Sequence, residues 1–277
     1  MKDKKLEYIE ILLMKRDDAF LGGSYNLIIH SILNTFDLIE LIDYYLPLAD
    51  SKLKRSIESN IHKRVVLIQN PDNLYDILYK HLQETDYFHR QRIRKILMML
   101  LPLLDRIYKR DFFNNFYNSK YSNDISSALT ICSDIWDNDL NTMILNDYLK
   151  TGKEIYLKTF LKYGEIENIL PHIVQIWKFE PSNYLKMDII RRLSKYHIDK
   201  FEFIRQVEPE KYLLAISLSD KVFDDETLVD CLNDIKEDLK PFGILSLSRL
   251  KKWELIEEEI KKYVYEAQKQ YTISSNV

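Results

Sequence analysis

The chain contains 277 residues, of which 43 are acidic and 40 are basic, so its formal net charge at neutral pH is −3. The chain has only 5 glycines and 7 prolines. This low content excludes collagen-like and linker architectures and disfavours β-rich folds that need tight turns. Because 46% of the residues are hydrophobic and 12% are aromatic, the composition also excludes a disordered chain. We therefore expect an ordered and mostly helical protein.

Helical periodicity continues along nearly the whole chain, and no stretch of alternating polarity is long enough to predict a strand. Proline or glycine interrupts this periodicity at several positions, including Pro71, Gly152 and Pro209, where each residue suits the start or the end of a helix. The predicted fold class is therefore all-α. The predicted helices cover residues 4–15, 26–46, 51–69, 72–84, 87–101, 103–118, 123–136, 139–150, 153–163, 166–179, 183–195, 199–207, 209–219, 225–239, 242–249 and 251–269.

Six of the predicted helices share one recurring pattern, which can be aligned on a single apolar or small residue in each. Successive markers are 32, 31, 31, 25 and 32 residues apart. A recurrence of this length predicts helix pairs that cannot bury their apolar faces alone and therefore stack on their neighbours. The six markers are Ile96, Ala128, Thr159, Ile190, Ala215 and Leu247.

The segment 169–196 resembles a HEAT repeat. In that family an apolar first helix carries Leu-Leu-Pro near its start, a short link contains proline, and a second helix carries a basic residue and then Leu-Gly near its end. Here serine replaces the last glycine. The resemblance extends more weakly over about 90–250 and implies a right-handed α–α superhelix (solenoid) of HEAT-like, armadillo-type helix pairs. The matching residues are Leu170, Pro171, Pro181, Leu185, Lys186, Leu193 and Ser194.

We expect the whole chain, 1–277, to form one α-solenoid domain. Residues 1–70 fit the repeat pattern poorly and predict an atypical N-terminal cap, whereas 71–250 form the repeats. The helix 251–269 is predicted to cap the stack, and 272–277 to form a frayed tail. One apolar stripe of the capping helix should dock on the preceding repeat, leaving polar faces at the end of the solenoid. The stripe contains Trp253, Ile256, Ile260, Tyr263, Val264 and Ala267.

Searches for catalytic motifs favour a non-enzymatic protein. The sequence has no glycine loop that cradles phosphate, no nucleophile elbow and no local set of zinc ligands, so we expect no cofactor and no metal. Cys132 and Cys231 are isolated, which favours a reducing cytoplasm over a secreted disulfide scaffold. Glu7 and Glu10 interrupt any secretory signal, and the longest apolar run, 96–104, is too short to cross a membrane. The richness in Lys, Asn, Ile and Tyr suggests an AT-rich, bacterial genome.

Charge is unevenly distributed along the chain, and three groups of residues are candidates for binding a partner. Segment 89–110 is strongly basic, 183–195 carries a second basic group, and 202–238 is strongly acidic. A basic patch attracts an acidic partner or a phosphate backbone, whereas the alternative is a solvated helix face with local pairs such as Asp188 with Arg192. The candidates are Arg90, Arg92, Arg94 and Lys95, then Arg191 and Lys195, and finally Asp224, Asp225, Asp230 and Asp234.

We predict a helical-repeat protein that binds another protein through its curved surface, as a scaffold or adaptor. A first alternative is a HEAT-like protein that binds nucleic acid, including a DNA glycosylase for alkylated bases that uses the Trp and Asp residues of 134–139 with Trp177. The net charge disfavours this alternative, and Asp137 or Asn138 as a helix N-cap, with Trp136 packed in the core, is the simpler interpretation. A second alternative is an immunity or antitoxin-type inhibitor that uses the acidic segment 202–238 against a basic toxin.

Overall fold

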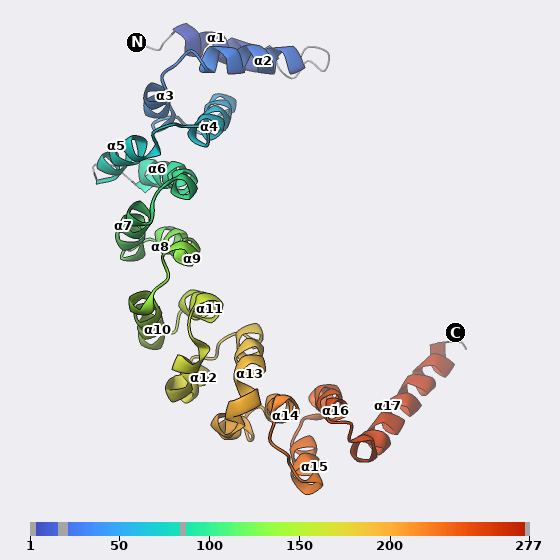
Figure 1. Ribbon diagram of the computed structural model, residues 1–277. Helices are drawn as coiled ribbons and strands as arrows, with labels where there is room; N and C mark the ends of the chain where they lie inside the picture. The colour runs from blue at the N-terminus through green and yellow to red at the C-terminus, as the bar shows by residue number, and fades with distance from the viewer. Residues whose placement is uncertain (1–3, 16–21, 84–86, 275–277) are drawn as a thin grey trace. The chain divides into compact units, whose positions relative to one another are not determined.

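The computed structural model describes residues 4–15, 22–83 and 87–274, and Figure 1 shows the elements in chain order. All regular secondary structure in these ranges is helical, with short 3₁₀ segments (η) between some α-helices, and none of these residues belongs to a strand. The all-α prediction is therefore confirmed. The chain divides into two compact units, Met1–Ile135 and Trp136–Val277. The expectation of one solenoid domain stays a prediction.

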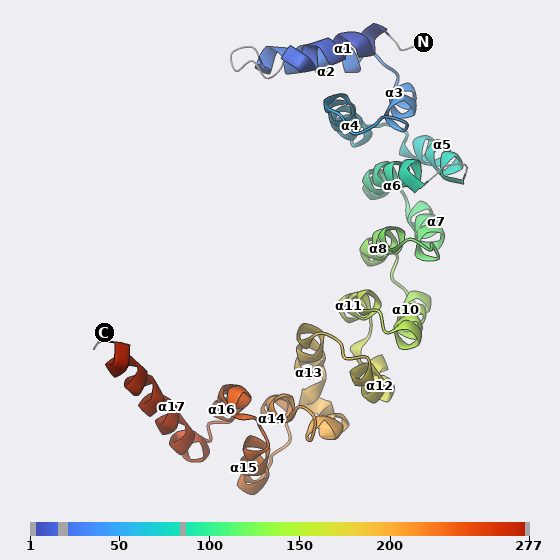
Figure 2. The same cartoon turned by 180° about the vertical axis from the view of Figure 1, so that it is seen from behind.

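In its described residues, the first unit contains α1 (Lys4–Lys15), α2 (Gly22–Leu33), α3 (Leu38–Tyr45), α4 (Lys52–Val65), α5 (Pro71–Gln83), α6 (Tyr87–Leu100), η1 (Leu101–Leu103), α7 (Arg106–Tyr117), α8 (Ser122–Thr130) and α9 (Cys132–Ile135). The helices pack as neighbouring pairs: α1 with α2, α3 with α4, α5 with α6, and α7 with α8. Figures 1 and 2 show that α4, α6 and α8 follow one another along one side of this unit, and α3, α5 and α7 along the other. The unit is thus a two-layered series of helix pairs.

In its described residues, the second unit contains α10 (Asn138–Thr151), α11 (Glu154–Tyr163), η2 (Ile166–His172), α12 (Ile173–Lys178), α13 (Asn183–His197), η3 (Ile198–Ile204), α14 (Pro209–Leu218), α15 (Asp225–Asn233), η4 (Glu237–Leu239), α16 (Lys240–Arg249) and α17 (Trp253–Ser274). Here α10 packs on α11, α11 on α13, α13 on α14, α14 on both α15 and α16, and α16 on α17. The helices α11, α13, α14 and α16 therefore lie side by side in succession, as both views show.

Short polar side chains begin several of these helices. Ser51 accepts a hydrogen bond from the backbone N–H of Lys54 at 3.1 Å, and Asp137 accepts one from the backbone N–H of Leu140 at 2.9 Å. Such N-caps satisfy backbone donors that the first helical turn leaves free. Of the two N-cap candidates, the structure selects Asp137, and Asn138 is the first residue of α10. At the other end of α10, Gly152 adopts the left-handed conformation with φ of 66°, which glycine reaches without strain.

Several of the predicted helices were wrong in extent or type. The helix expected at 225–239 is divided into α15 and η4, and that expected at 166–179 begins as the 3₁₀ segment η2. The single helix expected at 26–46 is two helices, α2 and α3, because Asp37 begins a new helix by accepting the backbone N–H of Ile39 at 2.8 Å. The helix expected at 123–136 ends at Thr130 and resumes after one residue as α9. The helix expected at 199–207 is the 3₁₀ segment η3.

The recurring pattern marks the core of both units. All six phase markers are buried, with between 0% and 8% of each residue exposed, and each lies on a different helix among α6, α8, α11, α13, α14 and α16. Four aromatic residues in the second half of α7 are also buried, namely Phe112, Phe113, Phe116 and Tyr117, and the rings of Phe112 and Phe116 stack with centroids 4.3 Å apart. This aromatic cluster is therefore part of the packed core.

The last helix differs from its prediction. α17 extends to Ser274, so the part of the predicted tail at 272–274 is helical, while 275–277 lie outside the described residues. Of its expected docking stripe, Ile256 is buried, whereas Trp253 and Val264 are 53% and 50% exposed. The side chain of Ala267 lies outside the described part of the chain. The stripe was therefore assigned wrongly: α17 has one apolar side against α16 and a second apolar side in solvent.

Candidate functional site

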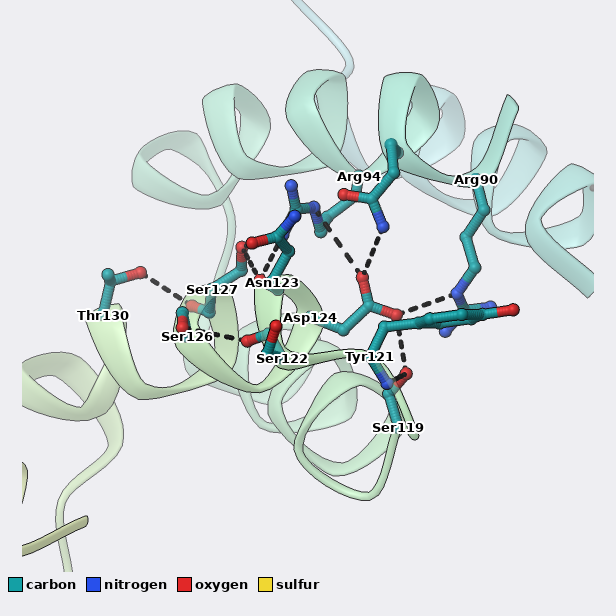
Figure 3. A network of polar contacts seen from close by, with 11 residues as sticks. Arg90, Arg94, Ser119, Tyr121, Ser122, Asn123, Asp124, Ser126, Ser127 and Thr130 are labelled. Carbon is teal, nitrogen blue, oxygen red and sulfur yellow. Dashed lines mark hydrogen bonds and ion pairs between the residues drawn. The ribbon is translucent and has the colours of Figure 1, made fainter. Parts of the chain in front are cut away.

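The basic segment of the first unit surrounds a buried carboxylate, that of Asp124 on α8 (Figure 3). Asp124 is fully buried and accepts hydrogen bonds from the Nε of Arg90 at 2.9 Å, the Nε2 of Gln91 at 3.1 Å and the Oγ of Ser119 at 2.7 Å. A buried charge is tolerated when hydrogen bonds and an opposite charge compensate it. Arg90 therefore joins α6 to α8.

Arg94, one turn along α6, reaches the same part of α8. Its Nη1 donates to the backbone carbonyl of Asn123 and to the Oγ of Ser127 at 2.8 Å, and its Nε lies 3.8 Å from the Asp124 carboxylate. Burial lowers the pKa of the Arg94 guanidinium, and the nearby Asp124 carboxylate opposes that effect. Arg94 is thus a second connection between α6 and α8.

Besides Arg94, several arginines donate to backbone carbonyls that lie far away in the chain. Arg92 donates to the carbonyls of Tyr45, Leu46 and Leu48, at the end of α3 and just beyond it, with 3.0 Å to Tyr45 and 2.6 Å to Leu48. Three further arginines behave in the same way. The donor and acceptor pairs are Arg64 with Phe36 at 3.0 Å, Arg106 with Ile135 at 3.2 Å, and Arg192 with Leu161.

Lys95 is the exposed member of the first basic group. Its side chain is 61% exposed, and its Nζ lies 3.8 Å from the Glu58 carboxylate on α4. Together with His62 and Met99 it borders a shallow pocket of about 320 Å³ across α4, α6 and α8. The structure thus separates the group of four: Arg90, Arg92 and Arg94 hold helices together, and Lys95 faces solvent.

The four acidic candidates lie on α15 or at its ends. Asp224 is the N-cap, where a hydrogen bond from the backbone of Thr227 at 2.7 Å lowers the pKa of the Asp224 carboxyl. Asp225 pairs with Lys252 at 2.5 Å. Asp230 and Asp234 are exposed. Two of these acids therefore have local structural partners, and all four face solvent along a single helix.

The two tryptophans proposed for a base-binding pocket pack against neighbouring aromatic rings. Trp136 is half-buried, with its ring 5.6 Å from that of Tyr163. Trp177 is buried between the rings of Phe201 and Phe203 at 6.0 and 5.7 Å, and its indole N–H donates to Glu208 at 2.7 Å. Neither ring belongs to a groove in the second unit, which lies across α13, α14 and α16.

That groove crosses α13, α14 and α16 and has a volume of about 440 Å³. Its side chains come from one face of each helix, because residues three, four or seven apart share a face. The floor includes Leu214, which is 7% exposed, whereas Phe242 and Leu245 on the wall are 59% and 53% exposed. The lining residues used below are Met187 and Arg191 on α13, Glu210, Lys211 and Leu214 on α14, and Phe242, Leu245 and Arg249 on α16.

The groove carries unpaired positive charge. The Nζ of Lys211 lies 3.0 Å from the carboxylates of both Glu208 and Glu210, so this lysine is neutralised locally. Arg191 and Arg249 are exposed, and neither has a hydrogen bond or ion pair with any described residue. Two guanidinium groups therefore flank an exposed apolar surface, which suits a ligand that has carboxylates and apolar groups.

The sequence identified only part of this groove. Arg191 was a predicted binding residue and lies in it, whereas Lys195, one turn further along α13, is exposed but is absent from the lining. Phe242, Leu245 and Arg249 were missed. Their signal was present in the sequence, because these three residues share a helix face that the buried Leu247 does not occupy.

No helix in the described residues is both long and apolar enough to cross a membrane. Across the same ranges, no three His, Cys, Asp or Glu side chains are grouped so that they could hold a metal ion. Comparison of the chain with protein-family models, with curated proteins and with solved structures finds no match.

Proposed function

We propose that this chain is a HEAT-like α-solenoid that binds another protein, and that the groove across α13, α14 and α16 holds a partner segment containing acidic and apolar residues. The burial of all six phase markers, four of whose five spacings are 31 or 32 residues, supports the repeat assignment. The side-by-side order of α11, α13, α14 and α16 supports it further.

The single observation that carries the binding proposal is the combination of exposed apolar side chains with two unpartnered guanidinium groups. Phe242 and Leu245 expose more than half of their surface, which favours contact with apolar side chains of a ligand. Arg191 and Arg249 each offer a planar set of donors that matches a carboxylate. Aromatic and arginine side chains are also the types that contribute most to protein interfaces.

Protein is a better ligand for this groove than a nucleic-acid backbone. A phosphate backbone needs a row of cations that each neutralise one phosphate, and it leaves an apolar wall without a contact unless bases stack on it. Here two guanidinium groups stand beside Phe242, Leu245 and Met187, and Glu210 adds a negative charge to the lining. Acidic side chains that alternate with leucine or phenylalanine satisfy both features.

The test uses fluorescein-labelled peptides in which Asp or Glu alternates with Leu or Phe, with matched peptides that carry Lys in place of the acids. Fluorescence anisotropy should show binding of the acidic peptides alone. Arg191→Glu and Arg249→Glu should each weaken binding by about tenfold or more, because tenfold corresponds to the loss of about 1.4 kcal/mol. Phe242→Ser should weaken it as well.

Lys195→Glu is the matched control, since it changes the same charge on the same helix outside the groove. Binding of the acidic peptides that is unchanged by Arg191→Glu and Arg249→Glu would contradict the proposed groove. Tighter binding of labelled single-stranded DNA than of the acidic peptides, lost in the same variants, would favour the nucleic-acid alternative instead.

A further inference from the structure

The solvent side of α17 carries an apolar stripe with no partner in the described chain. Trp253, Val264 and Tyr265 are 53%, 50% and 68% exposed, and with Ile260 they line a shallow surface groove of about 290 Å³. The indole N–H of Trp253 and the hydroxyl of Tyr265 have no hydrogen bond to any described residue. An aromatic side chain with an apolar body and a free polar group is typical of protein interfaces.

The same stripe carries two opposite charges at its centre. Glu257 and Lys261 both line the groove, one helical turn apart, and their charged groups lie 3.0 Å from each other. The order along the stripe is therefore aromatic, acidic, basic and aromatic, at Trp253, Glu257, Lys261 and Tyr265. These four residues are equally spaced and symmetrical about the level of residue 259.

This symmetry makes the stripe complementary to itself. When two copies of a helix pair in antiparallel fashion about a twofold axis at residue 259, positions equally far from 259 face each other. Trp253 then meets Tyr265 of the second copy, and Glu257 meets Lys261 of the second copy. An isologous contact of this kind requires one surface that fits its own copy, and opposite charges that face each other select the register.

We propose that α17 is a homodimerisation helix, which pairs with α17 of a second copy of this chain in antiparallel orientation through Trp253, Ile260, Val264 and Tyr265. In the pair, Glu257 and Lys261 of both copies form a square of four alternating charges. The aromatic ends lie about 18 Å apart along each helix, given a rise of 1.5 Å per residue.

The small area of this surface limits the affinity of the dimer. Stable interfaces bury about 1,200–2,000 Å² in total, and two helices in contact over about three turns bury less than that. The association is therefore reversible and depends on protein concentration. The charge square makes it sensitive to salt, because its charges lie near the solvent.

Sedimentation velocity of the full-length protein, from micromolar to hundreds of micromolar concentration, tests the proposal. The parent chain should shift from monomer to dimer across this range. Lys261→Glu places four negative charges in the square and Glu257→Lys places four positive charges there, so each variant should stay monomeric. The double variant with Glu257→Lys and Lys261→Glu restores the alternation and should dimerise again.

A charge reversal on the same helix but away from the stripe serves as the control. Lys262→Glu changes the charge on a residue that is 66% exposed and whose ion pair, with Glu259, involves no residue of the square. This variant should dimerise like the parent, and circular dichroism should show equal helix content in all variants. A parent chain that stays monomeric throughout would overturn the proposal. So would dimers that persist in both single charge reversals, or a double variant that stays monomeric while it remains folded.

Discussion

The indole N–H of Trp177 on α12 donates a hydrogen bond to the carboxylate of Glu208, which immediately precedes α14, over 2.7 Å. Lys186 on α13 and Lys211 on α14 donate to the other oxygen of the same carboxylate, at 2.8 and 3.0 Å. One acidic side chain therefore connects three helices of the second unit.

The contacts of Glu208 predict how its contribution to stability depends on pH. Burial raises the pKa of the Glu208 carboxyl, but the hydrogen bonds from Lys186, Trp177 and Lys211 outweigh it, so the pKa lies below its ordinary value of 4.5. The carboxylate then stabilises the fold fully above pH 4.5, and this contribution is lost as the pH falls through the lower folded-state pKa.

Glu208→Gln should lower the free energy of unfolding at pH 7 by about 1–3 kcal/mol, because it removes charge-assisted hydrogen bonds. The difference from the parent should shrink as the pH falls from neutrality towards 3. Urea unfolding at a series of pH values measures both effects. A difference that stays constant over this range would show that the carboxylate does not carry the contribution.

Asp124→Asn should destabilise the first unit by about 2–4 kcal/mol, because Arg90 and Arg94 lose a buried acceptor of opposite charge. Asp134→Asn is the matched control. It removes an ion pair with Lys109 at 2.8 Å from a carboxylate whose side chain is 45% exposed, so it should cost less than about 1 kcal/mol. Chemical denaturation of the two variants compares the costs, and equal costs would contradict a structural role for the buried network.

Both cysteines should be inert in the folded protein. Cys132 and Cys231 are fully buried, and burial raises the pKa of the Cys132 thiol to about 12 and raises that of Cys231 as well. The reactive thiolate is therefore scarce at pH 8, and a reagent cannot reach it. A chromogenic disulfide reagent should modify no thiol of the native chain within minutes and both thiols in guanidinium chloride. Prompt reaction of the native chain would contradict the burial of Cys132 on α9 or of Cys231 on α15.

Gly152→Ala should destabilise the second unit by about 2 kcal/mol, since an alanine in the left-handed conformation is strained by about 1–2 kcal/mol. Its Cβ would also lie 2.8 Å from a ring carbon of Phe179, which must move. Gly23→Ala on α2 is the control, because a Cβ there meets nothing within 4 Å, and it should leave thermal stability unchanged or slightly higher. Thermal melts followed by circular dichroism separate the two, and equal melting temperatures would contradict this account of Gly152.

Local patterns in the sequence predicted the helices and their buried faces well, because periodicity and capping act over a few residues. Ile96 and Leu247 are buried as expected. The break between α2 and α3 was missed because no glycine or proline marks it, although Asp37 followed three residues later by Glu40 is a capping signal.

The partners of the charged residues could not be predicted in this way. Arg90 and Arg92 bind acceptors that are 34 and 47 residues away in the chain. The number of basic residues in this segment therefore predicts a basic surface, whereas in the folded chain these arginines form hydrogen bonds between helices. The groove was missed for a similar reason: periodicity shows that α16 has apolar residues on two faces, but the neighbouring helices decide which face stays in solvent.

The arginine connections have a consequence for how the sequence can change. Arg92 and Arg192 donate to main-chain carbonyls, and every amino acid, proline included, supplies that acceptor. Replacing Leu46 or Leu161 by another residue leaves the acceptor in place, whereas no other side chain reproduces the planar fork of donors. The hydrogen bond is thus sensitive to substitution of the arginine alone, whereas a substitution of Leu46 or Leu161, which are 8% and 5% exposed, costs the packing of a buried side chain and keeps the hydrogen bond.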